Sequence, residues 1–408
     1  MAEATISGSR DEGPRPSAVA AIVRRLAAFA QVGEIRIELP TGARIRRLGA
    51  EPGPSADIRF LTWRSAARAL TGGPVGLAKG YRDGEWTSSD LASLIEWGAR
   101  NGPRFRRALK WSSATRFLAR FDHWRNANTR AGSRRNIMAH YDLGNAFFRL
   151  WLDSSMTYSS AIYPRPEATL EEAQEAKLAR IIERLGLEGG ENVLEIGGGW
   201  GALATSVAAS TGARVTSVTV SEAQLDFARN RLHAAGLADR VKFELMDYRD
   251  VVGDFDRIVS IEMIESVGKH FLPQYFATIR DRLRPQGVCV LQAITIAEDR
   301  FEAYCRRPDF IQQFIFPGGF LPSKTHMHEV IEAQGLKLIA CETFADSYAL
   351  TLREWRRRFL GAWPEIERLG FQESFRRLWE FYLGYCEGAF RAGAIDVGLY
   401  SLARADPR

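Results

Sequence analysis

The chain is poor in cysteine and lacks any long apolar run. Its four cysteines, Cys289, Cys305, Cys341 and Cys386, show no C-x-x-C spacing, so neither a disulfide framework nor a zinc site is indicated, and we predict no bound metal. No apolar segment approaches the ~20 residues needed to span a bilayer. The N-terminus also lacks the basic and apolar regions of a secretory signal. We therefore expect a cytoplasmic protein.

The chain is too long for one ordinary domain. Its 408 residues favour two domains, and a hydrophobic fraction of 46% is ample for their cores. We expect disorder in residues 1–17, which are polar and rich in proline and glycine. The predicted order then continues with a small α+β domain (18–103), a basic helical linker (104–136) and a nucleotide-binding domain (137–408).

Residues 193–203 read VLEIGGGWGAL, an apolar run followed by four glycines in five positions and then small helix-forming residues. This pattern predicts a strand, a tight turn and a helix start, which together present backbone N–H groups to a nucleotide-like cofactor. We infer a Rossmann-like α/β domain in which Gly197 and Gly199 line the cofactor.

The same stretch also fits the dinucleotide pattern G-x-G-x-x-A, so the surrounding sequence must show which type of cofactor it binds. A dinucleotide site expects an acid at the tip of the next strand, but the predicted strand 214–220 ends without one. Instead, Glu195 precedes the glycines, and a third strand leads into Asp247 and Tyr248. This order is typical of S-adenosylmethionine methyltransferases.

The net charge of +6 is unevenly distributed. A basic stretch interleaved with aromatic residues runs from Arg104 to Arg135, and a shorter basic cluster runs from Arg353 to Arg358. Nucleic acid, anionic lipid and a solvated helix face are the competing interpretations. In the first stretch, apolar residues recur at roughly helical spacing, which favours a membrane surface. No RNA-binding signature accompanies it.

Several long motifs occur in order along the chain. Residues 139–163 read AHYDLGNAFFRLWLDSSMTYSSAIY, residues 255–268 read FDRIVSIEMIESVG, and residues 314–323 read FIFPGGFLPS. In these motifs the chain resembles the cyclopropane-fatty-acyl-phospholipid synthases, and the resemblance extends into the N-terminal domain through GLAKGYRDGEW at 76–86. It implies a class I methyltransferase fold for residues 137–408.

The resemblance also implies an activity. These synthases transfer a methyl group from S-adenosylmethionine to the cis double bond of an unsaturated acyl chain in a membrane phospholipid. Loss of a proton from the resulting carbocation closes a cyclopropane ring. For this chain we expect that cofactor, that substrate, peripheral contact with the anionic inner face of the membrane and no nucleic acid partner. A homodimer remains open.

The family motifs assign cofactor contacts to ten positions. Tyr158 and Ser159 match residues at the methionine end of the cofactor, and Asp247 and Tyr248 match residues at its adenine end. Neutral side chains at the tip of the second strand stand where other families use a ribose-binding acid, although helix capping is an alternative role for two of them. The full set is Tyr158, Ser159, Glu195, Gly197, Gly199, Thr219, Ser221, Gln224, Asp247 and Tyr248.

The resemblance further implies a bicarbonate ion that accepts the proton. Glu265 and Tyr348 match two of its ligands, and Ile294 matches a backbone contact, but Ser160 and Gln292 replace the family's cysteine and histidine. These two changes leave bicarbonate open. They also favour a methylene- or methyl-branched product over a cyclopropane.

Two further residues have an open role. Cys386 matches a family cysteine near the acyl site, with a small buried apolar residue as the alternative interpretation. Glu262 lies three residues before Glu265, and a loop or helix-end acid is one interpretation of it. The alternative function is a methyltransferase-fold protein that acts on a nucleic acid, or that binds the cofactor without acyl chemistry.

Overall fold

The computed structural model describes residues 16–108 and 143–406. The chain divides into two compact units, Met1–Trp111 and Ser112–Arg408. The segment predicted to be disordered lies outside the described residues except for Pro16 and Ser17, which begin the first helix. The predicted linker lies outside them from residue 109 onward, and its first five residues belong to the helix Leu91–Ala108.

The N-terminal unit combines a small sheet with three helices, as its alternating pattern predicted. Its strands follow the order β2-β1-β3-β4, in which β1 is antiparallel to β2 and parallel to β3. Asn101 connects helix to sheet, because its side chain accepts from Val32 N at 3.1 Å and donates to Val32 O at 3.0 Å. The elements are α1 (Pro16–Ala28), β1 (Val32–Glu38), β2 (Arg44–Leu48), β3 (Glu51–Phe60), α2 (Trp63–Arg82), β4 (Trp86–Thr87) and α3 (Leu91–Ala108).

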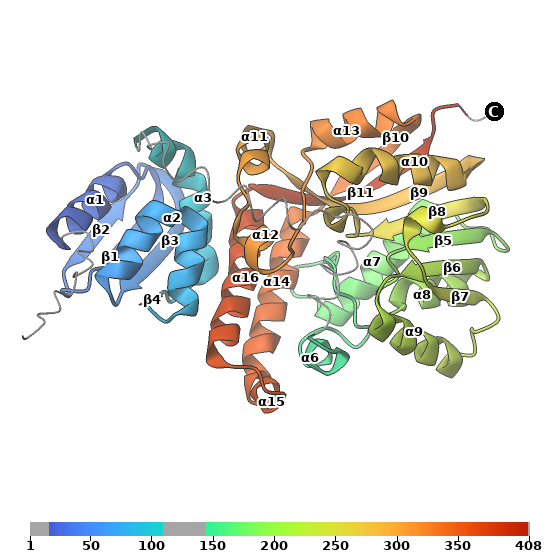
Figure 1. Cartoon of the computed structure of the whole chain (residues 1–408), viewed down its shortest axis with the longest axis horizontal. Helices are drawn as coiled ribbons and strands as arrows, with labels where there is room; N and C mark the ends of the chain where they lie inside the picture. Colours follow the sequence, from blue (N-terminus) through green and yellow to red (C-terminus); the bar gives the residue numbers. More distant parts are fainter. Residues whose placement is uncertain (1–15, 109–142, 407–408) are drawn as a thin grey trace, which may run out of the picture. The chain divides into compact units, whose positions relative to one another are not determined.

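The C-terminal unit is built on a seven-stranded sheet in the order β10-β11-β9-β8-β5-β6-β7 (Figure 1). The five strands from β9 to β7 in that order are parallel, and β11 is antiparallel to both of its neighbours. This confirms the predicted Rossmann-like α/β fold. The strands are β5 (Asn192–Ile196), β6 (Arg214–Thr219), β7 (Val241–Leu245), β8 (Phe255–Ile261), β9 (Leu283–Ile296), β10 (Leu336–Thr343) and β11 (Ile395–Arg404).

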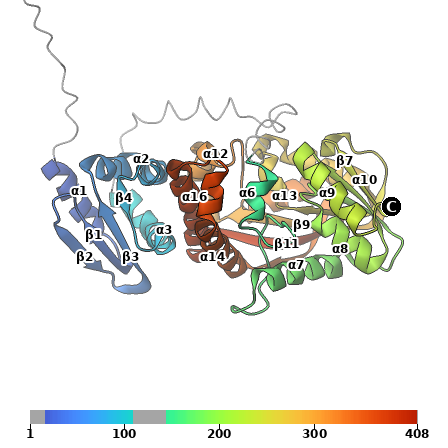
Figure 2. The ribbon, with the colours of Figure 1, turned by 90° about the horizontal axis from the view of Figure 1, so that it is seen from below.

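Helices cover both faces of this sheet. In Figure 2, α7 lies on one side of β9 and β11, and α10 and α13 lie on the other. The sheet therefore has two buried cores, one under each helix layer. One layer holds α7 (Leu170–Leu185), α8 (Ala202–Thr211) and α9 (Glu222–Ala234), and the other holds α10 (Leu272–Arg282) and α13 (Lys324–Ala333).

The remaining helices gather aromatic side chains. The long helices α14 and α16 pack against each other as a hairpin, with α15 at their turn (Figure 1). No helix within the described ranges is long and apolar enough to cross a membrane. The helices outside the two layers are α6 (Asn145–Arg149), η2 (Tyr248–Asp250), η3 (Ile264–Ser266), η4 (Lys269–Phe271), α11 (Glu298–Arg306), α12 (Phe310–Phe314), α14 (Ala345–Gly361), α15 (Trp363–Arg368) and α16 (Glu373–Arg391).

Candidate active site

The glycine turn between β5 and α8 forms one wall of a deep cavity. Gly197, Gly199 and Gly201 have positive φ values of 86°, 51° and 82°, which favour glycine because it has no Cβ. Gly198 has no space for a side chain, since a Cβ there would meet Ser217 Oγ at 1.9 Å. The turn thus places the backbone against the cavity and directs the start of α8 toward it, an arrangement suited to a nucleotide-like cofactor.

Polar residues at the carboxyl ends of neighbouring strands complete this part of the cavity. Thr219 and Gln224 line it, and Thr219 Oγ1 donates to Gln224 Oε1 at 2.9 Å. Ser221 does not line it but caps α9, with its Oγ accepting from Gln224 N at 3.4 Å. Asp247 and Tyr248 also line the cavity. The structure therefore brings nine of the ten predicted cofactor residues to one cavity.

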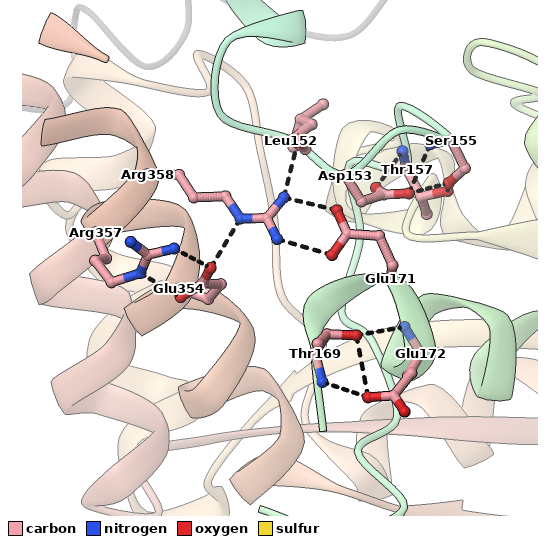
Figure 3. A network of polar contacts seen from close by, with 10 residues as sticks. All are labelled: Leu152, Asp153, Ser155, Thr157, Thr169, Glu171, Glu172, Glu354, Arg357 and Arg358. Carbon is pink, nitrogen blue, oxygen red and sulfur yellow. Dashed lines mark hydrogen bonds and ion pairs between the residues drawn. The ribbon is translucent and has the colours of Figure 1, made fainter. Parts of the chain in front are cut away.

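The segment 152–160, which carries Tyr158, Ser159 and Ser160, is held by ionic and polar contacts from three sides (Figure 3). Within the segment, Asp153 accepts from Ser155 N at 2.8 Å and Thr157 N at 3.0 Å. From α14, Arg358 donates to Leu152 O at 3.4 Å and makes two bonds to the Glu171 carboxylate on α7, at 2.9 and 2.8 Å. Two helices thereby fix the segment against the cavity.

Helix α7 also contacts this segment directly, through a buried lysine that the sequence analysis did not single out. Lys177 is 1% exposed and lines the cavity, and its Nζ donates to Ser159 Oγ at 2.7 Å. Burial lowers the pKa of Lys177 to about 8, against the attraction of Glu262 and Asp153. A lysine on the apolar face of an amphipathic helix is the sequence signal that could have indicated it.

Three of the predicted catalytic residues converge, but on a different carboxylate from the one expected. Glu262 Oε1 accepts from Ser160 N at 2.8 Å and from Gln292 Nε2 at 2.7 Å. Its Oε2 accepts from Tyr348 Oη at 2.6 Å. Glu262 lies in the loop after β8, in line with one interpretation of the sequence, and it also lines the cavity. Its φ of 48° is rare for a residue with a side chain.

Glu265 lies next to Glu262 but is held differently. Its Oε1 accepts from Ile294 N at 2.7 Å, and its buried Oε2 has no hydrogen-bond partner among the described residues. Burial, followed by repulsion from Glu262, raises the pKa of Glu265. Burial also raises the pKa of Glu262, but Tyr348, Ser160, Lys177 and Gln292 oppose that rise. The negative charge of the pair therefore belongs on Glu262 and the proton on Glu265.

Aromatic rings surround this carboxylate pair. Tyr348 packs against Phe390 at 4.5 Å between ring centroids, and Tyr158 packs against Trp355 at 5.2 Å. The hydroxyl groups of Tyr158 and Tyr382 lie 3.0 Å apart. Such faces can stabilise a nearby cation without reacting with it.

Cys386 lies among the tyrosines of α16. Burial raises the pKa of its thiol, with Asp309 adding to the rise. The thiol therefore stays protonated, as in a small buried residue, and has little nucleophilic character.

The second basic cluster, Arg353–Arg358, is largely ion-paired. Arg356 binds Glu387 at 3.0 Å, and Arg357 binds Glu354 at 2.7 Å. Arg358 binds Glu171, as described above, and Trp355 is fully buried. These contacts give the three arginines structural roles rather than those of a lipid- or nucleic-acid-binding patch.

Comparisons with known proteins place this geometry in a family. A family model described as mycolic acid cyclopropane synthetase matches residues 128–399. The tuberculostearic acid methyltransferase UfaA1 of Mycobacterium tuberculosis is 40% identical over 344 residues, covering 82% of this chain and 80% of that protein. The cyclopropane-fatty-acyl-phospholipid synthase of Escherichia coli K12 is 35% identical over 368 residues, covering 88% of this chain and 90% of that protein.

Solved structures of cyclopropane synthases also match this chain. The cyclopropane synthase MmaA2 from M. tuberculosis matches with a TM-score of 0.63 and 31% identity, covering 66% of this chain and 98% of that chain. The mycolic acid cyclopropane synthase CmaA1, complexed with SAH and CTAB, matches with a TM-score of 0.62 and 30% identity, covering 66% of this chain and 97% of that chain. The chain therefore belongs to the cyclopropane synthase family of S-adenosylmethionine-dependent methyltransferases.

Proposed function

We propose that this enzyme methylates the cis double bond of an unsaturated acyl chain in a membrane phospholipid and forms a branched product. Support for the substrate comes from the family and from the E. coli relative, which is a fatty-acyl-phospholipid synthase. Support for branching comes from the higher identity with a tuberculostearic acid methyltransferase and from Ser160 and Gln292. In this proposal, the cavity lined by the glycine turn holds S-adenosylmethionine, which supplies an electrophilic methyl group when bound.

The observation that carries the proposal is the carboxylate of Glu262 in that same cavity. It is half-buried and oriented by three hydrogen-bond donors that favour its charged form, so it is a suitable general base. When a methyl group joins one carbon of the double bond, the other carbon becomes cationic. A hydride shift moves the cation to the methylated carbon. Glu262 then accepts a proton from the transferred methyl group, and the electron pair of that C–H bond forms the double bond of a methylene group.

Bicarbonate does not fit this arrangement. The side chains expected to hold it, Gln292 and Tyr348, both donate to Glu262. The expected backbone donor, Ile294 N, is bound to Glu265. We infer that a carboxylate of the protein occupies the position of the exchangeable anion, and we assign no step to bicarbonate.

The place of action follows from the substrate. An acyl chain in a bilayer requires the enzyme to work at the membrane surface, and the predicted basic stretch 104–135 is suited to anionic headgroups. Residues 109–135 of that stretch lie outside the described residues. No observation favours the nucleic acid alternative, and a homodimer stays a prediction.

Product analysis tests the proposal. The enzyme is incubated with S-adenosylmethionine and vesicles of a monounsaturated phospholipid, and the acyl products are examined by mass and proton NMR spectra. We expect a mass gain of one CH₂ with the signals of terminal alkene protons. Upfield cyclopropyl protons would refute branching, and the absence of any methylated lipid would refute the substrate assignment.

A further inference from the structure

Lys177 is a buried cation that no step above uses. Lysine is rarely buried without a partner, because moving its charge out of water is costly. Here the side chain is 1% exposed, and its ammonium group donates to a neutral hydroxyl, Ser159 Oγ, at 2.7 Å. A neutral acceptor alone does not compensate for a buried ammonium group.

The charged neighbours of Lys177 supply that compensation. Its electrostatic partners are Glu262 first and Asp153 second. Asp153 is already committed to the 152–160 segment through Ser155 and Thr157. Glu262 shares the cavity wall with Lys177, and the other carboxylate beside it, Glu265, repels its charge. The cation thus lines the same cavity as Glu262 and attracts its charge without a direct ion pair.

We propose that Lys177 is a positioning residue that keeps Glu262 ionised as the proton acceptor and, through the same ammonium group, fixes Ser159 at the cavity wall. It does not touch the reacting carbons. Its charge decides which carboxylate of the pair holds the proton. The proposal rests on the proposed role of Glu262, but its main test does not require turnover.

Besides its donors Ser160 and Gln292, titratable groups from four elements face Glu262. Lys177 approaches from α7, Glu265 from η3, Tyr348 from α14 and Tyr382 from α16. Burial places the pKa values of both tyrosines well above the usual range, so they stay neutral near pH 7. Lys177 is therefore the positively charged group acting on Glu262, and its removal leaves burial opposed only by hydrogen bonds from Tyr348, Ser160 and Gln292.

This arrangement makes a test by substitution specific. Lys177→Met keeps the length and fills the apolar site without the charge, whereas Lys177→Arg keeps the charge. Ser159→Ala removes the hydrogen-bond acceptor but leaves the lysine charge in place. If Lys177 merely anchors Ser159, then Lys177→Met and Ser159→Ala behave alike.

The titration of Glu262 is read in the full-length, resting enzyme labelled with ¹³C-carboxyl glutamate. Its NMR signal is identified by its absence in the Glu262→Gln variant. Relative to the wild type, we expect the Glu262 midpoint to rise by about one pH unit or more in Lys177→Met, by less than half of that in Ser159→Ala, and little in Lys177→Arg. If Lys177→Met fails to fold, Lys177→Gln provides the same comparison.

Turnover gives a second readout. The acidic limb of the kcat profile should move to higher pH in Lys177→Met, with a fall in kcat of about 10²-fold near pH 7 and a smaller change in KM. A Glu262 midpoint that stays unchanged in both Lys177→Met and Lys177→Gln would overturn the proposal. Equal shifts of the midpoint in Lys177→Met and Ser159→Ala would also overturn it. If the wild type makes no methylated lipid but its Glu262 midpoint still responds to Lys177, the proposed function fails and this inference stands.

Discussion

Two acids at the ends of neighbouring strands, the buried Glu195 and the half-buried Glu262, are held in opposite ways. Glu262 has three hydrogen-bond donors and a nearby ammonium group, which favour its charged form. Glu195 accepts from one hydroxyl, Ser217 Oγ, and burial raises its pKa to about 7. The surroundings therefore favour the charged form of the carboxylate at one strand end and its neutral form at the other.

The raised pKa of Glu195 predicts a pH-dependent stability. The protonated acid favours folding fully below the ordinary value of 4.5, and this contribution is lost as the pH rises through about 7. Glu195→Gln cannot ionise. In the cofactor-free protein, its free energy of unfolding should therefore exceed that of the wild type by a margin that grows from pH 4.5 to about pH 7, reaching about 3 kcal/mol.

Denaturant unfolding at pH 5, 6 and 7.5 measures this margin. Glu367→Gln on the exposed surface of α15 is the control, because its neighbourhood is solvated. A margin for Glu195→Gln that stays constant across the three pH values would show that Glu195 ionises in the folded protein as it does in water.

Residue identities at the site were largely predictable, and their pairing was not. Ser160, Gln292 and Tyr348 do meet in space, but at Glu262 rather than at an ion beside Glu265. The difference depends on the positive φ of Glu262, which directs its side chain into the cavity. Glutamate does not favour that conformation, so sequence alone gives no reason to expect it.

At the level of elements, the segment 152–160 depends on contacts from outside itself. Arg358 joins α14, α7 and this segment through Glu354, Glu171 and Leu152 O (Figure 3). Arg357, one position earlier, binds Glu354 alone among these groups, and its side chain is 71% exposed. The pair offers a matched comparison on one helix.

We predict that Arg358→Met lowers the free energy of unfolding by about 2 kcal/mol, because it leaves partly buried carboxylates without their cation. The affinity for S-adenosylhomocysteine should also fall several-fold, since Tyr158 and Ser159 lose their support. Arg357→Met should change stability by less than about 0.5 kcal/mol. Calorimetry measures the unfolding free energy and the S-adenosylhomocysteine affinity of both variants. Equal changes in the Arg358→Met and Arg357→Met variants would show that Arg358 does not position the segment.

Elements that a local sequence pattern encodes could be predicted, whereas contacts set by the tertiary fold could not. The strand–glycine–helix unit at 193–203 is encoded locally by apolar residues and glycines, so it is found where expected. The arginines of α14 are a charge run whose partners, Glu171 and Glu387, lie far away in sequence. Pairing over such separations is set by the tertiary fold and leaves no local pattern.

At the level of the whole molecule, contact with the membrane surface remains a prediction from the basic stretch. In this prediction the basic residues of the stretch bind anionic headgroups electrostatically. We expect the protein to sediment with vesicles containing anionic lipid at low salt and to be released at high salt.

A charge-matched pair of variants locates this contact. Replacing Arg116, Arg120 and Arg125 with serine should weaken vesicle binding about 10²-fold, at about 1 kcal/mol for each arginine. Replacing the exposed Arg24, Arg25 and Arg214 removes the same charge elsewhere and should have a smaller effect. Equal losses in the two triple variants would assign binding to net charge rather than to the basic stretch.

The dependence of turnover on bicarbonate tests the role of Glu262 most directly. Glycine accepts the φ of 48° at position 262, so Glu262→Gly should fold while removing the carboxylate from its donors. We predict that wild-type turnover is the same with and without bicarbonate. Glu262→Gly should be at least about 10²-fold slower without the ion and should recover activity when it is added. A wild-type enzyme that needs bicarbonate, or a Glu262→Gly variant as active as the wild type without it, would contradict Glu262 as the proton acceptor.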